Sequence, residues 1–270
     1  MGIIEKYKDE ILYYQIEGFN LKDNINTNIN YESQETSGIQ KSKEFMLNNN
    51  MNHIFSTRIG WNQENIFNDL SKVLDLPEEN IYRAKQVHGT DVLVINDQNY
   101  KDIMTEQKDG LVTNIKGIAL ATYHADCVPI YFYDKKKHVI GLAHAGWKGT
   151  LNNISKSIVE TMVKHFGSNI GDISVAIGPS IGVCCYEIGH DVEIIFTDKY
   201  TSNMDIITEK DNRLYLDLWK VNKINLIDLG IKEENIFYSD TCTSCRVDRL
   251  YSYRKEEGTK NRMIAAISLN

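Results

Sequence analysis

The stretch LATYHADCVPIYFYDKKKHVIGLAHAGWKGT, residues 120–150, contains one cysteine and three of the chain's seven histidines. It consists of two apolar segments that are joined by a lysine-rich turn. The first segment, residues 118–133, is dense in Ala, Ile, Val, Tyr and Phe, which is typical of a buried strand. Pro129 cannot donate a ladder hydrogen bond, so we expect this strand to end or bend close to Cys127 and to expose the thiol there.

The second apolar segment, residues 138–145, predicts a strand that ends at His144. A glycine-rich turn follows at residues 146–150. Apolar residues three and four positions apart then predict a helix that ends at Gly167. Thr150 is the expected N-cap of this helix, because its hydroxyl can accept a free N–H of the first turn. The pattern is therefore strand, glycine-rich turn and helix.

Length and charge bound the class of protein. A chain of 270 residues can bury a full core. The net charge of -7 argues against a nucleic acid or an anionic membrane as the main partner. No apolar run reaches the length of about 18 residues that a membrane span needs, and the charged N terminus does not resemble a signal peptide. We therefore expect a cytoplasmic protein with its five cysteines reduced.

The remaining elements follow from periodicity and from glycine and proline boundaries. Residues 21–50, rich in Asn, Ser and Lys, predict a long surface loop. Strands are expected within 3–20, at 53–58, on both sides of a turn in 81–95, and at 173–177, 236–238 and 263–269. Helices are expected from Ile66 to a stop at Pro77, at 186–196 and at 218–229. Strands cluster in the first half and alternate with helices in the second. The prediction is an α/β fold, with helices packed on mixed β-sheets, in which residues 1–270 form a single domain.

A candidate metal site combines His88, Cys127 and His144, which come from three separate segments. Two imidazoles and a thiolate suit Zn²⁺, and three protein ligands leave a fourth position for water or substrate. The alternative is a buried free cysteine beside two hydrogen-bonded histidines, and spacing alone does not decide between them. His124 faces the opposite side of an extended strand from Cys127, so we expect it to be packed or hydrogen-bonded.

The other cysteines carry weaker signals. Cys242 and Cys245 have C-x-x-C spacing, but the sequence has no second pair and no neighbouring thioredoxin-like pattern, so this is a weak indication of zinc or redox chemistry. Cys184 and Cys185 follow a glycine-rich turn and are expected to line a tight core. None of the four enters the predicted catalytic site.

Three cationic side chains are candidates for substrate binding. Lys148 lies where the free N–H groups at the start of a helix favour an anion, although the P-loop pattern is absent. Arg58 ends a predicted strand, and Arg254 lies near the C terminus, where it and Arg262 flank Gly258. The alternative for each is a solvated surface charge.

Several uncommon motifs in one order resemble the YfiH/YlmD family, bacterial relatives of the human laccase-domain protein. The motifs are HIFSTR at 53–58, KQVHGTDV at 85–92, DGLVTN at 109–114, ADCVPI at 125–130, GLAHAGWKGT at 141–150, AIGPSIGVCCYEIG at 176–189 and LYSYRKEEGTKNRM at 250–263. The resemblance covers roughly residues 53–267. It implies a mixed α/β fold shared with bacterial toxin deamidases, and one zinc ion, rather than copper, held by His88, Cys127 and His144.

The resemblance also implies an activity. Members of the family are purine nucleoside enzymes that convert adenosine, inosine and methylthioadenosine with phosphate to free base and sugar 1-phosphate, and that deaminate adenosine. Arg58, Lys148 and Arg254 are then the candidates for holding phosphate. Two departures bear on this. The loop after Arg58 is shorter than in the family. Lys148 replaces the usual arginine, and its ammonium group is a single point charge that cannot form the paired hydrogen bonds of a guanidinium.

Other classes of function remain open at this stage. The older family label, multicopper polyphenol oxidase, fits poorly because the chain has no H-x-H motif. A metal-free hydrolase or deamidase could use Cys127 with His144 as nucleophile and base. A binding module without turnover is a third alternative. The H-x-E and P-C-x-x-C signature of nucleobase deaminases is absent, so deamination would need a different kind of site.

Overall fold

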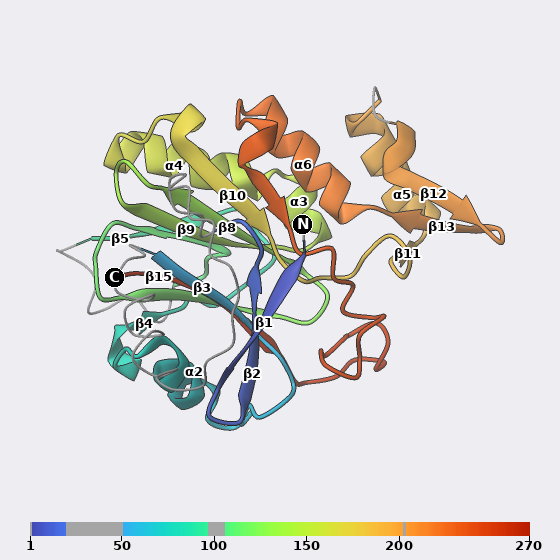
Figure 1. Ribbon diagram of the computed structural model, residues 1–270. Coiled ribbons are helices and arrows are strands. Elements are labelled where there is room, and N and C mark those ends of the chain that lie inside the picture. Colours follow the sequence, from blue (N-terminus) through green and yellow to red (C-terminus); the bar gives the residue numbers. More distant parts are fainter. Residues whose placement is uncertain (1, 20–50, 97–105, 202–203) are drawn as a thin grey trace, which may run out of the picture.

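Two six-stranded sheets lie one above the other and carry helices on their outer sides (Figure 1). The computed structural model describes residues 2–19, 51–96, 106–201 and 204–270. The surface loop predicted for residues 21–50 lies outside the described residues. Within them, no helix has both the length and the apolar character that crossing a bilayer requires.

The first sheet places the last strand of the chain near its middle. Its strands, in spatial order, are β1 (Ile3–Lys8), β2 (Ile11–Ile16), β3 (Met51–Ser56), β15 (Met263–Leu269), β7 (Ala119–His124) and β4 (Ile81–Tyr82). Neighbouring strands are antiparallel except for β4 and β7. The sheet is therefore mixed, as the sequence predicted.

The second sheet contains the strands that carry the central motifs. Its order is β14 (Ile236–Tyr238), β10 (Ile173–Ile177), β8 (Val128–Asp134), β9 (Val139–Ala145), β6 (Gly110–Thr113) and β5 (Val92–Ile95). The pairs β10–β14 and β5–β6 are parallel and the others antiparallel. This second mixed sheet confirms the predicted fold class.

The chain crosses from one sheet to the other at Ala125, Asp126 and Cys127, between β7 and β8. Asp126 has a φ of 82°, a left-handed conformation that reverses the chain there. The expected break near Cys127 is thus confirmed. Because β7 and β8 belong to different sheets, the thiol lies where the two sheets meet.

Helices cover both outer faces. They are α2 (Ile66–Leu74) on the first sheet, and α3 (Trp147–Leu151), α4 (Ile154–Phe166) and α6 (Leu218–Asp228) on the second (Figure 1). Four 3₁₀ turns are described as well: η1 (Glu78–Asn80), η2 (Ile170–Asp172), η3 (Met204–Ile206) and η4 (Glu233–Asn235). The layers are therefore helix, sheet, sheet and helix.

The start of the helix after the glycine-rich turn differs from the prediction. Thr150 lies inside the short helix α3, and Asn153 is the N-cap of α4, with its side chain accepting the N–H of Lys156 at 3.0 Å. Thr150 is used elsewhere, because its hydroxyl oxygen accepts a hydrogen bond from Asn222 at 3.1 Å. The predicted end at Gly167 is confirmed by its φ of 67°.

The helix predicted for residues 186–196 is only partly correct. Glu187 and Ile188 form strand β11, which pairs with β13 (Arg213–Leu216) in a small sheet completed by β12 (Ile207–Lys210). Helix α5 then runs from His190 to Lys199. The cause is long-range pairing. Tyr215 and Leu214, which are 28 and 26 residues away, pair with the backbone of these two residues, and local periodicity does not record such a partner.

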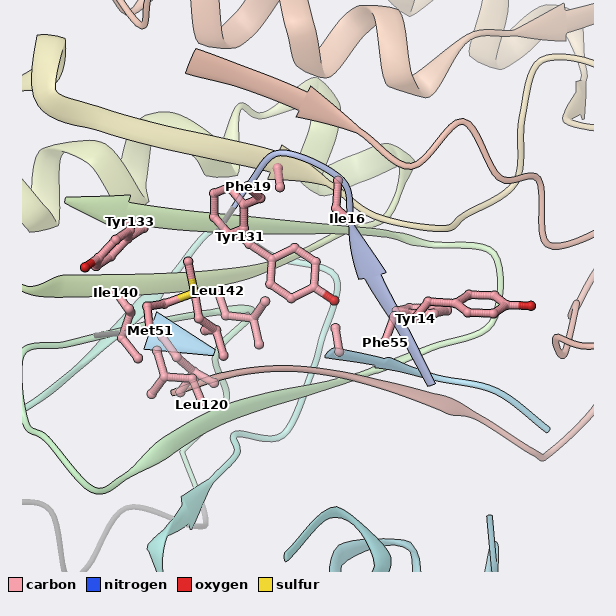
Figure 2. Packing of buried hydrophobic residues seen from close by; sticks show 14 of the residues in the cluster. Tyr14, Ile16, Phe19, Met51, Phe55, Leu120, Tyr131, Tyr133, Ile140 and Leu142 are labelled. Atoms are coloured by element: carbon pink, nitrogen blue, oxygen red, sulfur yellow. The ribbon is translucent and has the colours of Figure 1, made fainter. Parts of the chain in front are cut away.

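A large apolar cluster fills the space between the two sheets (Figure 2). Tyr131 of β8 lies at its centre, and its hydroxyl donates a hydrogen bond of 2.9 Å to the carbonyl of Ile54 in β3. The ring is fully buried, so this bond connects the two sheets without exposing a polar group. The junction that carries the thiol therefore lies beside a buried layer that both sheets share.

Candidate active site and metal centre

Three segments bring His88, Cys127 and His144 together. His88 lies in the turn between β4 and β5 with a φ of 61°, Cys127 lies at the crossing between the sheets, and His144 lies near the end of β9. Their ligand atoms all lie within 4.8 Å of one another, and Nε2 of His88 is 4.0 Å from Sγ of Cys127. The residues predicted as metal ligands thus form one cluster that could hold a metal ion.

Asp109 organises two of these three residues, and sequence reasoning missed it. Its carboxylate lies 2.8 Å from Nδ1 of His144, and it accepts the backbone N–H groups of Val87, His88 and Gly89 at 3.1, 3.0 and 2.7 Å. One buried carboxylate therefore orients the His144 ring and holds the turn that presents His88. The sequence feature that could have identified Asp109 is its position just before β6, as the first residue of the motif DGLVTN.

Charges inside the cluster shift its pKa values. Burial opposes ionisation of Cys127, but the imidazoles of His144 and His88 outweigh it and lower the thiol pKa to about 6. Burial likewise disfavours the charged form of His144, yet the Cys127 thiolate and Asp109 raise its pKa to about 9. Without a bound ion, the pair is therefore a thiolate and an imidazolium near neutral pH.

His124 is buried beside the cluster but is not one of its ligands. One ring nitrogen, Nδ1, donates to the carbonyl of Cys127 at 3.0 Å, and Nε2 accepts the hydroxyl of Thr122 at 2.7 Å. Burial and the neighbouring His144 hold its pKa well below the ordinary value, so the ring is neutral. This confirms the expectation that His124 is hydrogen-bonded, because both nitrogens already have partners.

Because Gly146 has no side chain, it leaves room for the side chains of His88 and Cys127. A Cβ atom at this position would lie 2.9 Å from Cδ2 of His88 and 3.3 Å from Sγ of Cys127. Its φ of -67° is open to any residue, so the requirement for glycine is one of space. Any side chain here would displace a ligand.

A cleft of about 770 Å³ opens onto the cluster. His88, Cys127 and His144 contribute to its lining. The other lining residues are three tyrosines, three cations and a few small or polar groups: Tyr123, Tyr186, Tyr253, Lys85, Arg254, Arg262, Ala84, Gln86, Ala125, Asp126 and Ile181. Aromatic rings and cations around a possible metal site can accommodate a flat ligand that carries an anion.

The three predicted cations lie in different places. Arg254 lines the cleft, where its guanidinium donates to the carbonyl of Glu187 at 2.7 Å and lies 5.3 Å from the centre of the Tyr186 ring. The side chains of Arg58 and Lys148 are not part of the lining. Lys148 is exposed and lies 5.4 Å from the ring centre of its neighbour Trp147.

Arg58 instead supports the C-terminal segment next to the cleft. Its Nη2 lies 2.6 Å from Glu256, and its guanidinium lies 4.4 Å above the Tyr251 ring. Glu256 in turn accepts the backbone N–H of Ser252 at 2.8 Å. Lys85 and Arg262, which sequence reasoning did not select for substrate binding, line the cleft instead. Both lie within family motifs, at 85–92 and 250–263, and this position was the available signal.

Asp126 fixes the wall of the cleft beside Cys127. Its carboxylate accepts the hydroxyls of Thr243 and Ser252 at 2.6 and 3.1 Å and the backbone N–H of Arg254 at 2.7 Å. Residues 243, 252 and 254, all more than 100 positions from Asp126, therefore meet at its carboxylate, and Arg254 is positioned relative to Cys127 through it.

The fold and the site define a class of protein: two mixed sheets between helices, with a His₂Cys group at the base of an aromatic and cationic cleft. The family model described as "Multi-copper polyphenol oxidoreductase laccase" matches residues 56–270. The chain belongs to this family, and the resemblance to YfiH and YlmD proteins is confirmed.

Curated relatives carry two kinds of name. "Purine nucleoside phosphorylase YlmD" of Geobacillus stearothermophilus is 35% identical over 73% of this chain and 75% of the relative. "Adenosine deaminase RL5" from an unknown prokaryotic organism is 30% identical over 69% of this chain and 74% of that protein. The match spans 58% of "Purine nucleoside phosphorylase YlmD" of Bacillus subtilis, at 36% identity over 60% of this chain. It spans only 47% of "Purine nucleoside phosphorylase LACC1" of Mus musculus, at 33% identity over 77% of this chain.

Two solved structures agree with the fold. The YfiH protein of Bacillus licheniformis superimposes with a TM-score of 0.73 and 29% identity, covering 82% of this chain and 93% of that one. YlmD of Geobacillus stearothermophilus gives 0.72 and 29%, covering 82% and 92%. The layer arrangement is therefore shared with these two solved structures.

Proposed function

We propose that this chain is a zinc-dependent purine nucleoside enzyme. It would split adenosine, inosine and methylthioadenosine with phosphate into free base and sugar 1-phosphate, and would also deaminate adenosine. The observation that carries the proposal is the shared cleft, in which the His88, Cys127 and His144 group lies beside three tyrosines and three cations. Its volume of about 770 Å³ suits a ligand of nucleoside size. The names of the relatives support the same class.

The residues present fit a zinc ion. Two imidazoles and one thiolate are borderline-soft ligands, and their donor atoms lie within 4.8 Å of one another. Asp109 accepts the Nδ1 proton of His144, which leaves Nε2 as the donor atom toward the cluster. When bound, zinc would supply Lewis-acid chemistry at neutral pH.

The protein's own side chains would bind and orient the nucleoside. A purine base presents a flat π surface, and Tyr123, Tyr186 and Tyr253 offer rings in the lining of the cleft. Gln86 also lines the cleft, but Tyr123 already engages it: its amide nitrogen donates to the carbonyl of Tyr123 at 2.9 Å and its oxygen accepts that residue's N–H at 2.7 Å. These bonds hold the Tyr123 backbone in place within the wall.

Phosphate would bind at the cationic part of the cleft. Arg254 is the predicted contact that lies in the lining, and Lys85 and Arg262 share that lining. A phosphate oxygen would attack the anomeric carbon of the sugar while the bond from that carbon to the purine nitrogen breaks. The departing base would take the electron pair of that bond and the proton that the phosphate gives up. In deamination, water replaces the exocyclic amine and ammonia leaves.

A second candidate function has an observation of its own. Cys127, with a pKa of about 6, His144, with a pKa of about 9, and Asp109 form a thiolate, imidazolium and carboxylate series. This is the arrangement that a metal-free thiol hydrolase or deamidase needs. The two candidates differ in their dependence on metal.

The family's description as a multicopper oxidase is less consistent with the residues. A His₂Cys group can bind copper, but a multicopper oxidase needs further histidine-rich centres. In the described part of the chain, the second cluster of possible ligands contains cysteines only. This favours zinc over copper in the proposal.

Incubation with inosine tests the proposal. Hypoxanthine should appear with ribose 1-phosphate only when phosphate is supplied, and a chelator should abolish the reaction until zinc is restored. Hypoxanthine release that ignores phosphate would exclude phosphorolysis. Full activity in metal-free protein that is lost in Cys127→Ala would instead establish the thiol hydrolase.

A further inference from the structure

Four cysteines outside the proposed active site form a second cluster. Cys184 and Cys185 lie in the turn after β10, and Cys242 and Cys245 lie in the segment after β14. Sγ of Cys245 lies 3.6 Å from that of Cys184 and 3.5 Å from that of Cys185, and all four sulfurs lie within 4.8 Å of one another. The C-x-x-C pair that looked isolated in the sequence therefore has a partner pair. The expectation that Cys184 and Cys185 line a tight core is wrong, because Cys184 is exposed and Cys185 is half-buried.

Backbone pairing places the two turns against each other. Ser180 and Cys242 form a parallel bridge, in which Ser180 donates to the carbonyl of Thr241 at 3.2 Å and Thr243 donates to the carbonyl of Ser180 at 3.0 Å. This bridge continues the parallel pairing of β10 with β14 beyond the ends of the strands. The meeting of the two cysteine pairs thus follows from the topology of the second sheet.

The spacing of the sulfurs matches a single tetrahedral ion. A zinc–sulfur bond of about 2.3 Å places two thiolates of a tetrahedron about 3.8 Å apart, whereas a disulfide needs about 2.0 Å. An iron–sulfur cluster holds its thiolates farther apart, because metal and sulfide atoms lie between them. The N–H of Gly182 also donates to Sγ of Cys242 at 3.3 Å, which ties the first turn to the sulfur of the second.

We propose that Cys184, Cys185, Cys242 and Cys245 bind a second zinc ion with a structural role. Four thiolates complete its coordination and leave no open position for substrate, unlike the three ligands at the base of the cleft. The two sites would therefore differ in chemistry as well as in place, and the proposal does not depend on the reaction assigned to the cleft.

The second site would support the wall of the cleft. Thr243, within the C-x-x-C segment, donates to Asp126 at 2.6 Å, and Asp126 precedes Cys127. Ile181 donates its N–H to the carbonyl of Asp126 at 3.0 Å and lines the cleft. An ion that joins the two turns would thus hold Thr243 and Ile181, two of the partners of Asp126, in place.

Metal content of the purified full chain, measured against protein concentration, tests the proposal. The parent should contain one more zinc ion per chain than Cys245→Ser, whatever the occupancy of the other site, and Cys184→Ser should repeat the loss. Cys127→Ala should keep the second ion. Val183→Ala, in the same turn but without a thiol, is the matched control and should retain the parent content.

Cobalt substitution gives an independent measurement. Thiolate-to-cobalt charge-transfer absorption increases with the number of thiolate ligands, so Cys127→Ala should keep most of the intensity of the parent and Cys245→Ser should lose most of it. Circular dichroism establishes whether each variant is folded. Equal metal content and equal cobalt spectra in the parent and in folded Cys245→Ser would overturn the proposal, as would a parent mass that is two hydrogens lower with two of these cysteines joined as a disulfide.

Discussion

The carboxylate of Asp109 lies 2.8 Å from Nδ1 of His144 and accepts three backbone N–H groups from the turn that presents His88. Two of the three candidate metal ligands therefore depend on one buried side chain. A metal centre assembled from distant segments needs such a residue, because none of its ligands is held by a local spacing.

Replacement of Asp109 by Asn should weaken metal binding. The amide can no longer accept the Nδ1 proton of His144 as a carboxylate does, and the loss of a partner of this kind lowers metal affinity by about 10- to 100-fold. Competition with a chelator measures the change. Asp91→Asn, at an exposed carboxylate, is the control. Equal affinity in Asp109→Asn and the parent would show that Asp109 does not position the ligand.

Gly146→Ala should displace the ligands without unfolding the chain. The added Cβ would lie 2.9 Å from the His88 ring, while the backbone φ of -67° suits alanine. Metal content should fall in this variant and remain unchanged in Gly171→Ala, where the nearest atom would be 3.5 Å away. A Gly146→Ala protein with full metal content would contradict the packing described here.

In metal-free protein, the pH dependence of the rate at which Cys127 is alkylated should show a low thiol pKa. The lowered pKa of about 6 predicts half-maximal reactivity near pH 6, compared with an ordinary thiol at about 8.5. His144→Gln should move the midpoint upward, because it removes the imidazolium that favours the thiolate. Peptide mass spectrometry separates Cys127 from the other four cysteines. A midpoint in the ordinary thiol range would refute the thiolate assignment.

The same pair should give metal-free protein a stability maximum between about pH 6 and pH 9. The depressed pKa of Cys127 means that its contribution is lost as the pH falls through about 6. The raised pKa of His144 means that its contribution is lost as the pH rises through about 9. Thermal unfolding of the parent and of Cys127→Ala across this range should differ most in the middle, and a constant difference would exclude the pair as its source.

Arg254→Ala should raise the KM for phosphate more than Lys148→Ala does. Arg254 lines the cleft, and a hydrogen bond to a charged group contributes about 1.5–3 kcal/mol, which corresponds to roughly a tenfold effect or more. Lys148 lies outside the lining. Adenosine deamination, which uses water, serves as the internal comparison. A larger phosphate effect in Lys148→Ala would reverse the assignment.

Tyr131→Phe should destabilise the fold by about 1–2 kcal/mol, because it removes the hydrogen bond to Ile54 between the sheets. Tyr14→Phe is the matched control. Its ring is buried in the same cluster (Figure 2), but its hydroxyl has no hydrogen-bond partner in the described part of the chain. Urea unfolding measures both variants. Equal stability losses would show that the inter-sheet bond contributes nothing specific.

Elements whose limits depend on neighbouring residues could be predicted from the sequence. The helix expected at 218–229 is observed as Leu218–Asp228, with Gly230 at a φ of 94° just after it. The strand expected at 263–269 has the same limits in the structure. The predictions for residues 186–189 and Thr150 were wrong because a distant strand and a distant asparagine use those groups instead.

The sequence by itself determined the mixed α/β class and the break at Cys127, because apolar periodicity and proline act over a few residues. Only the tertiary structure decided which side chains meet. Asp109 reaches His144 over 35 positions, and Cys184 reaches Cys245 over 61. Strand pairing and the crossing between the sheets bring such distant residues together, and no local sequence pattern identifies the partner.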